Sequence, residues 1–248
     1  MTLDVVFTPH GLAAADVAGR TVLVVDVLRA STTICAAMHH GARAIVVAAD
    51  IEDATRIAHS LDTPGVLLAG ERNCARIPGF QLGNSPEEMT AEAVAGKTLV
   101  MTTTNGTRAL LAATGAREVV VAGAVNLSVA AAIGAEALAA GNGLTILCAG
   151  REQGFGMDDA YIAGRLAIGA LGGRRTRKGL NDAALVSVDL VRRYGDHIER
   201  LFGLSHAGRD LIALGMRDDV LAAARVDAYP VAPRYLDRRI TVATPAGS

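Results

Sequence analysis

The sequence predicts an α/β fold in which a mostly parallel sheet carries helices on both faces. Apolar runs such as residues 21–25 and 144–148 show no polar alternation, as expected for strands that are buried on both faces. Segments with helical composition separate these runs. From residue 157 onward helical segments dominate, which predicts a helix-rich C-terminal part.

The expected strands and helices alternate from the N-terminus to residue 148. Each strand is a short apolar run, and the helix that follows Asp26 begins at a Ser/Thr cap. Residues 70–86 contain several Gly and Pro residues and are expected to form an irregular loop. Strands are expected at residues 3–7, 21–25, 43–48, 65–69, 97–101, 118–122 and 144–148, and helices at 31–40, 51–60, 87–94, 105–113 and 127–140.

The C-terminal part is expected to be helical with one returning strand. Gly179, Gly195, Gly203 and Gly215 stand where helix ends are expected. The basic residues 174–178 are expected to form a solvated turn, with phosphate contact as the alternative. Helices are expected at residues 158–171, 181–194, 197–201, 206–214 and 218–224, and an edge strand at 239–242.

A weak internal duplication bears on the domain organisation. Residues 19–23 resemble residues 96–100, and Gly-Ala-Arg followed by an apolar run occurs at both 41–47 and 115–121. The chain is therefore predicted to be a single domain over residues 1–248, with two pseudo-repeated halves at about 1–94 and 95–248. Coincidence between Ala- and Val-rich units is the alternative. If the repeat is real, the polar loops of the two units occupy equivalent strand ends.

Composition limits the classes of partner. The net charge of −1 gives no support for binding to nucleic acid or to a membrane surface, and aromatic residues amount to only 3%. The Ala-rich residues 124–141 are interrupted by polar residues and are expected to form a packed helix. The three cysteines lack the spacing of a zinc site. The first residues show no signal-peptide pattern, so a cytoplasmic location is expected.

The first polar loop of interest follows the strand at residues 21–25. Asp26 is expected at the carboxyl end of that strand, where open α/β sheets place their ligands, and Arg29 and Ser31 follow it. A carboxylate, a guanidinium and a helix N-terminus close together are suited to a metal ion and an anion. The alternative is an Asp–Arg pair that only caps the helix.

Three further loops follow strands in the same way. In residues 101–108, hydroxyls, Asn105 and Gly106 precede a helix, which suits anion binding but is also typical of an ordinary helix cap. Glu71 follows the apolar run 65–69, with a surface ion pair between Glu71 and its neighbour as the alternative. Arg151 follows the strand at 144–148, and two aspartates open the next helix, where the helix dipole alone explains them.

Taken together, the loops favour magnesium and an anionic ligand. Carboxylates without a Cys/His cluster suit Mg²⁺ better than zinc, and arginines beside N–H-rich loops suit phosphate or sulfonate. The P-loop, the dinucleotide-binding turn and the Gly-x-Ser-x-Gly nucleophile elbow are all absent from the sequence.

The combination of loops resembles the signature segments of the 2-phosphosulfolactate phosphatase family. The resemblance runs from about Val22 to Pro230, and it departs from the family pattern at Gln81, where an acidic residue is common, and at Asp158, where Glu is usual. The matching segments are 26–32 (DVLRAST), 70–72 (GER), 79–86 (GFQLGNSP), 102–107 (TTTNGT), 148–150 (CAG) and 157–159 (MDD).

The resemblance implies a Mg²⁺-dependent hydrolase that converts 2-phospho-3-sulfolactate to 3-sulfolactate and phosphate, a step associated with coenzyme M synthesis. It also implies a homodimer. The alternatives are a Mg²⁺-dependent phosphatase of another small anionic phosphate ester, and a non-catalytic α/β protein that binds an anionic metabolite.

The hypothesis assigns a role to each polar residue. Asp26, Glu71 and Asp159 are the expected Mg²⁺ ligands, and Asp26, Arg29 and Asn105 are the expected catalytic residues. Either a metal-bound water attacks phosphorus, or Asp26 attacks and forms an acyl phosphate. The expected substrate-binding residues are Ser31, Arg72, Asn84, Thr103, Thr104, Gly106, Thr107, Arg151 and His206.

Overall fold

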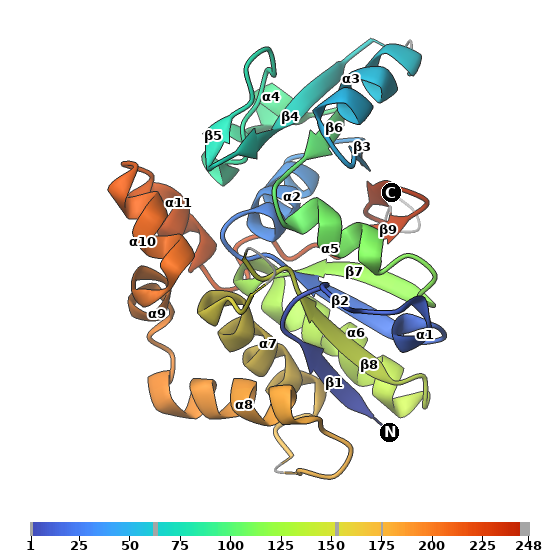
Figure 1. Ribbon diagram of the computed structural model, residues 1–248, viewed down its shortest axis with the longest axis vertical. Helices are drawn as coiled ribbons and strands as arrows, with labels where there is room; N and C mark the ends of the chain where they lie inside the picture. Colours follow the sequence, from blue (N-terminus) through green and yellow to red (C-terminus); the bar gives the residue numbers. More distant parts are fainter. Residues whose placement is uncertain (1, 62–63, 152–153, 175, 244–248) are drawn as a thin grey trace.

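In the computed structural model, residues 2–61, 64–151, 154–174 and 176–243 are described, and over these ranges the chain forms a ten-stranded sheet surrounded by helices (Figure 1). The strand order is β1-β8-β2-β7-β9-β10-β3-β6-β4-β5. The strands are β1 (Leu3–Val6), β2 (Thr21–Val25), β3 (Ala44–Val47), β4 (Val66–Arg72), β5 (Ala75–Arg76), β6 (Thr98–Thr102), β7 (Glu118–Ala122), β8 (Leu144–Cys148), β9 (Arg234–Leu236) and β10 (Arg239–Thr241).

The sheet consists of two groups of parallel strands joined by an antiparallel hairpin. Strands β1, β8, β2 and β7 form the first parallel group, and β3, β6 and β4 form the second. The hairpin of β9 and β10 pairs with β7 on one side and with β3 on the other. The prediction of a mostly parallel sheet is confirmed.

The strand expected at residues 239–242 is not at the edge of the sheet. It is β10, which lies inside the sheet between β9 and β3. Asp237 and Arg238 both have positive φ angles, of 47° and 64°, and they turn the chain tightly so that β10 folds back on β9. The hairpin thereby fills the space between the two parallel groups.

The two segments that resemble each other in sequence cross between the two groups. In the first segment the chain runs from β2 to β3, and in the second it runs from β6 to β7. Because β2 pairs with β7 and β3 pairs with β6, each of these segments begins in one group and ends in the other. The loops after β2 and β6 therefore start in different groups, and their helices α2 (Ala30–His39) and α5 (Gly106–Ala112) are in contact.

Helices cover both faces, and α9, α10 and α11 lie together at one side of the sheet (Figure 1). Close helix packing needs glycine at Gly164, where an added Cβ would stand 2.1 Å from the carbonyl oxygen of Ser187 in α8. The remaining helices are α1 (Ala14–Val17), α3 (Ile51–Ser60), α4 (Ala91–Val94), α6 (Leu127–Ala139), α7 (Met157–Ala170), α8 (Asp182–Tyr194), α9 (Ile198–Leu204), α10 (His206–Ala213) and α11 (Arg217–Ala223), with 3₁₀ turns at Pro86–Glu88 and Ala124–Asn126.

Two further predicted elements differ from the structure. The helix expected at residues 87–94 is divided into the 3₁₀ turn Pro86–Glu88 and the short helix α4, because Thr90 caps a new helix by accepting the N–H of Ala93. The strand expected to end at residue 69 continues as β4 to Arg72 and pairs with β5, so Glu71 lies within a strand.

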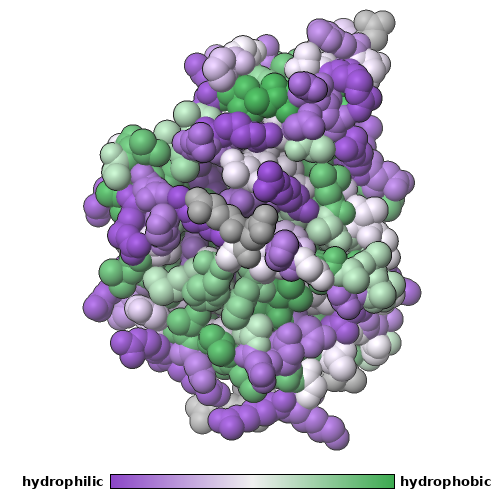
Figure 2. Space-filling model, in the orientation of Figure 1, coloured by the Kyte–Doolittle hydropathy of each residue, from purple (hydrophilic) through white to green (hydrophobic). Residues whose placement is uncertain are grey.

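The core of the described residues contains three apolar clusters. One lies under α6 and α7 and includes Tyr161 and Phe202, and a second lies under α2 and α5 and includes Ile34 and Leu110. A third and smaller cluster includes Phe80. In the space-filling view, hydrophilic residues gather around the middle of the face shown, next to α9–α11 (Figure 2). Among the described residues, no helix combines the length and the apolar character needed to cross a bilayer.

Candidate active site

A cavity of about 330 Å³ lies where β2, β4, β6 and β8 end. Asp26 follows β2, Glu71 lies near the end of β4, Thr104 follows β6 and Arg151 follows β8. All four line this cavity, and residues 204–207 and 211 of the α9–α10 region close its other side. Parallel strands end at a common edge, which is why segments distant in the sequence meet here.

Asp26 lies in an acidic environment. Its side chain is buried, and burial raises the pKa of its carboxyl from 3.8 to about 7, with further contributions from the carboxylates of Glu71 and Asp158. Arg29 acts in the opposite direction. Oδ1 of Asp26 accepts a long hydrogen bond from the N–H of Ala30 (3.4 Å), and no described group donates to Oδ2. No described N–H or O–H group therefore occupies Oδ2, and Oδ1 keeps one lone pair.

Ser31 shapes the turn that carries Asp26. The N–H of Asp26 donates to Oγ of Ser31 (2.9 Å), and the N–H of Ser31 donates to the carbonyl oxygen of Asp26 (2.7 Å). Ser31 is buried and is not part of the cavity lining. Its hydroxyl orients the backbone of Asp26.

Asp158 and Asp159 add two buried carboxylates at the start of α7. Asp159 accepts the N–H groups of Val27 (2.9 Å) and Gly150 (3.1 Å), and it thereby ties the loops after β2 and β8 together. Burial and the nearby carboxylates of Asp158 and Asp26 raise the pKa of Asp159 well above its usual range. Burial raises the pKa of Asp158 to about 6. This group of carboxylates is stabilised by protonation or by a bound cation.

Glu71 ties together the ends of β4 and β6. Its Oε1 accepts the N–H of Thr104 (2.8 Å) and its Oε2 accepts the N–H of Cys74 (2.9 Å). The two strands approach closely at Gly70, where an added Cβ would stand 2.1 Å from the carbonyl oxygen of Thr102. Glu71 is thus held in place by backbone donors and is not the surface ion-pair partner considered as an alternative.

The start of α5 packs directly against Asp26. A Cβ added to Gly106 would stand 2.7 Å from Oδ2 of Asp26 and 2.5 Å from Cβ of Ala30. Thr103 and Thr107 bond to each other: the N–H of Thr107 donates to Oγ1 of Thr103, and Oγ1 of Thr107 donates to the carbonyl oxygen of Thr103. These two threonines fix the turn and do not line the cavity.

Two oxygen atoms in the cavity wall have no partner within the described part of the chain. They are Oδ1 of Asn84 and Oγ1 of Thr104, and both are buried. Asn105 also lines the cavity, and its side chain makes no helix-capping hydrogen bond. Unpartnered buried polar atoms are costly in the free protein, so their presence here indicates a site that a ligand completes.

The cations of the site differ in depth. Arg29 is buried and forms an ion pair with Asp219 (2.6 Å). Arg151 lies nearer the surface and pairs with Asp210 (2.6 Å), whose Oδ2 is also 3.5 Å from Nδ1 of His206. Arg72 donates to the carbonyl oxygen of Glu71 and to Oγ1 of Thr102, and it lies outside the cavity lining.

The structure gathers part of the expected site into the cavity lining. Ser31, Arg72, Thr103, Gly106 and Thr107 support the lining residues from behind. The expected residues that do line the cavity are Asp26, Arg29, Glu71, Asn84, Thr104, Asn105, Arg151, Asp159 and His206.

Sequence reasoning missed three acidic residues. Asp158 faces the cavity, and the Asp-Asp pair that opens a helix was the signal for it. Asp210 and Asp219 bond to Arg151 and Arg29 from α10 and α11. Their positions depend on how these helices dock against the sheet, and no local pattern in the sequence indicates that.

The donor set is compatible with Mg²⁺. Among the described residues, no group of three His, Cys, Asp or Glu side chains is arranged to hold a metal ion by itself. Mg²⁺ typically binds through one or two carboxylates and completes its coordination with water and substrate phosphate oxygens. The oxygen-rich lining around Asp26 fits that pattern, whereas it would not fit zinc.

An α/β fold with buried carboxylates, arginines and unpartnered oxygens at its strand ends belongs to the class of α/β proteins that bind small ligands at that edge of the sheet. Residues 6–238 match the family model of 2-phosphosulpholactate phosphatase. The chain therefore belongs to the 2-phosphosulpholactate phosphatase family, and it is an enzyme, a phosphoric monoester hydrolase.

Curated relatives match along most of their length. The chain is 42% identical over 215 residues to a protein of Deinococcus radiodurans, covering 85% of each chain. It is 38% identical over 229 residues to one of Symbiobacterium thermophilum, covering 92% of this chain and 97% of the relative. A protein of Thermus thermophilus is 39% identical over 236 residues, covering 94% and 93%. Each of the three is named "Probable 2-phosphosulfolactate phosphatase".

Proposed function

We propose that the protein hydrolyses 2-phospho-3-sulfolactate to 3-sulfolactate and phosphate and that it requires Mg²⁺. The observation that carries the proposal is the group of buried carboxylates around Asp26, next to Arg29, in a cavity of a chain that belongs to this family. Buried like charges at this density favour a divalent cation, and the cation and Arg29 together suit a phosphoryl group.

Asp26 and Glu71 are the proposed holders of Mg²⁺, with Asp159 or its neighbour Asp158 beside them. Oδ2 of Asp26 is bonded by no described donor, whereas each oxygen of Glu71 and of Asp159 accepts one N–H and keeps a second lone pair. When bound, Mg²⁺ would neutralise the negative charge on the phosphoryl oxygens.

The side chains around the phosphoryl group have separate tasks. Arg29 stabilises the charge that develops on the phosphoryl oxygens, and Asn105 and Thr104 offer further polar contacts from the start of α5. The bond between phosphorus and the C2 oxygen breaks, water supplies the oxygen that phosphorus gains, and a proton from that water converts the C2 oxygen into the hydroxyl of 3-sulfolactate. Two routes are consistent with this arrangement: water attacks phosphorus while Asp26 orients it, or Asp26 attacks and the acyl phosphate is then hydrolysed.

The second anionic end of the substrate is assigned to the outer part of the cavity. Arg151 and His206 lie there, on the side of α10, and the apolar side chains of Phe155 and Leu204 lie beside them. The cavity lining holds four carboxylates beside Arg29, Arg151 and His206, so attraction of a multiply charged substrate depends on bound Mg²⁺ together with these cationic side chains.

Phosphate release from a panel of esters tests the proposal. We expect release from 2-phospho-3-sulfolactate in Mg²⁺ and none after addition of EDTA, with phospholactate and phosphoglycolate as weaker substrates. Faster turnover of phospholactate or phosphoglycolate would indicate a phosphatase of another small ester. Ligand binding that survives EDTA, without any phosphate release, would indicate a metabolite-binding protein.

The family resemblance extends the proposal to a homodimer that acts in the cytoplasm, in a step of coenzyme M synthesis. Light scattering coupled to size-exclusion chromatography tests the first part. We expect a mass near twice the 25.5 kDa of one chain. A mass near that of one chain would contradict the homodimer.

A further inference from the structure

Arg29 is held from behind by a residue of the C-terminal helices. Its Nη1 donates to Oδ2 of Asp219 in α11 (2.6 Å), and both side chains are buried. We propose that Asp219 is a positioning residue for Arg29, setting which donors of the guanidinium face the phosphoryl group. This inference rests on the proposed phosphatase activity.

The contacts of Arg29 leave a defined pair of donors. A guanidinium has five N–H groups. Nη1 donates to Asp219 and to Sδ of Met216 (3.2 Å), and Nη2 donates to the carbonyl oxygen of Cys74 (2.7 Å). The N–H of Nε and one N–H of Nη2 have no acceptor among the described residues. These donors are on neighbouring nitrogens of a side chain that lines the cavity, and such a pair binds two oxygens of a phosphoryl group.

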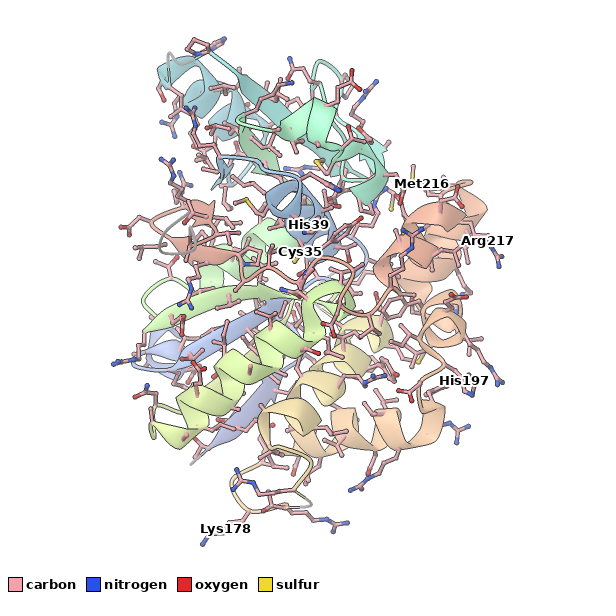
Figure 3. All side chains as sticks on the ribbon, turned by 180° about the vertical axis from the view of Figure 1, so that it is seen from behind. Cys35, His39, Lys178, His197, Met216 and Arg217 are labelled. Carbon is pink, nitrogen blue, oxygen red and sulfur yellow. The ribbon has the colours of Figure 1, made fainter. Side chains whose placement is uncertain are left out.

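Asp219 is itself held in a fixed orientation. Its Oδ1 accepts the hydroxyl of Ser85 (2.6 Å), so its two oxygens connect α11 to the loop before the 3₁₀ turn and to Arg29. Met216, which also contacts Arg29, stands at the start of α11 on the side of the 3₁₀ turn (Figure 3). Asp219, Met216 and Cys74 therefore hold the Nη1 and Nη2 atoms of the guanidinium, and its direction is fixed before a ligand enters.

A purely structural role is the alternative to be tested. A buried ion pair is weak evidence for stability, because the cost of removing two charges from water offsets their attraction. If the pair only docked α11, its loss would lower stability and leave the turnover of the folded enzyme unchanged. If Asp219 orients Arg29, its loss changes turnover even where the protein is fully folded.

A double-mutant cycle in kcat separates the two roles. We expect Asp219→Asn and Asp219→Ala to lower kcat by about 10- to 100-fold, taking as the scale the range found when the hydrogen-bond partner of a metal ligand is removed. In the Arg29→Ala background, Asp219→Ala should cause no further loss, because Asp219 acts through Arg29. Ser85→Ala, which frees one oxygen of Asp219, should give a smaller decrease of the same kind.

The matched control is Asp218→Asn. Asp218 is the exposed neighbour of Asp219 on the same helix, so the substitution removes the same charge without touching Arg29. It should leave kcat and KM at wild-type values. Circular dichroism and thermal denaturation of every variant identify those that are folded at the assay temperature.

Binding of inorganic phosphate in the presence of Mg²⁺, measured by calorimetry, gives a readout that needs no turnover. Asp219→Asn should weaken phosphate binding about 10-fold or more, whereas Asp218→Asn should not. Normal kcat and normal phosphate binding in folded Asp219→Asn would overturn the inference, as would independent, multiplicative losses in the double mutant. Failure of the wild type to release phosphate from any ester would instead overturn the proposed function.

Discussion

At the scale of single residues, Asp26 is where the fold concentrates unfavourable charge. Its carboxyl is buried with Glu71 and Asp158 close by, and its pKa rises to about 7 as a result. Such an arrangement lowers the stability of the ligand-free fold, and a bound cation would offset the repulsion. Strongly perturbed carboxyls in a cavity are for this reason typical of functional groups.

Asp26→Asn should abolish most of the phosphate release without unfolding the protein. The amide keeps the size of the side chain and removes the repulsion from Glu71, but it can neither hold Mg²⁺ as a carboxylate does nor attack phosphorus. We expect kcat to fall at least about 100-fold, the lower end of the range for loss of an acid or base group. Near-normal turnover in a Mg²⁺-supplemented assay would contradict the assignment, and circular dichroism checks the fold.

Gly106→Ala should damage both stability and activity. The new methyl group would stand 2.5 Å from Cβ of Ala30 and 2.7 Å from Oδ2 of Asp26, so α5 has to move away from the loop that carries Asp26. Overpacking of this kind costs about 1–3 kcal/mol. The matched control is Gly203→Ala in α9, where the nearest atom is 4.0 Å away. Urea denaturation and phosphate release that are equal for the two variants would contradict the close packing at Asp26.

At the scale of helices and strands, the sequence predicts the bounds of those elements whose ends are set by neighbouring residues. The strands β2, β7 and β8 and the helix α3 have the predicted bounds, because uninterrupted apolar runs and a helix cap define them. The interior position of β10 was not predictable, since it depends on pairing with β3, which is distant in the sequence.

The same limit applies to the site. Asp26 and Glu71 were predicted because each lies at or near a strand end and parallel strands end at one edge. The inward or outward direction of a hydroxyl was not predictable, so the mutual bonds of Thr103 and Thr107 were missed. Asp219 was also missed, because its contact with Arg29 depends on the docking of α11.

Asn181→Ala should destabilise two elements at once. Oδ1 of Asn181 accepts the N–H of Ala184 at the start of α8 (2.9 Å) and the N–H of Val5 in β1 (3.1 Å), and its Nδ2 donates to the carbonyl oxygen of Val5 (2.9 Å). We expect a loss of about 1–3 kcal/mol in the free energy of unfolding, from the lost cap and the unpaired strand groups. Asp50→Ala is the control, because its side chain caps α3 through Asp53. An equal or smaller loss at Asn181 would contradict the double role.

At the scale of the whole molecule, the cavity lies across the junction of the two parallel strand groups. Asp26 follows β2 and Asp159 lies in α7, the helix after β8, whereas Glu71 lies in β4 and Thr104 follows β6. A cation bound between them joins both groups, so binding should stabilise the entire fold by mass action.

The stability of the metal-free protein should therefore fall as the pH rises from 5 to 8. The pKa values of Asp26 and Asp158 are raised to about 7 and about 6, so the folded state holds these protons more tightly than the unfolded state does. Their contribution to stability is fully present below pH 3.8 and is lost as the pH passes through 6 and 7.

Thermal denaturation in EDTA should show this decrease in stability with rising pH, and Asp26→Asn should make the decrease smaller. Asp53→Asn is the control, because the pKa of Asp53 is lowered and its contribution is lost only at more acidic pH. Mg²⁺ should raise the melting temperature more at pH 8 than at pH 5. If the melting temperature of Asp26→Asn fell with pH as steeply as that of the wild type, the carboxyl of Asp26 would not be the cause of the pH dependence.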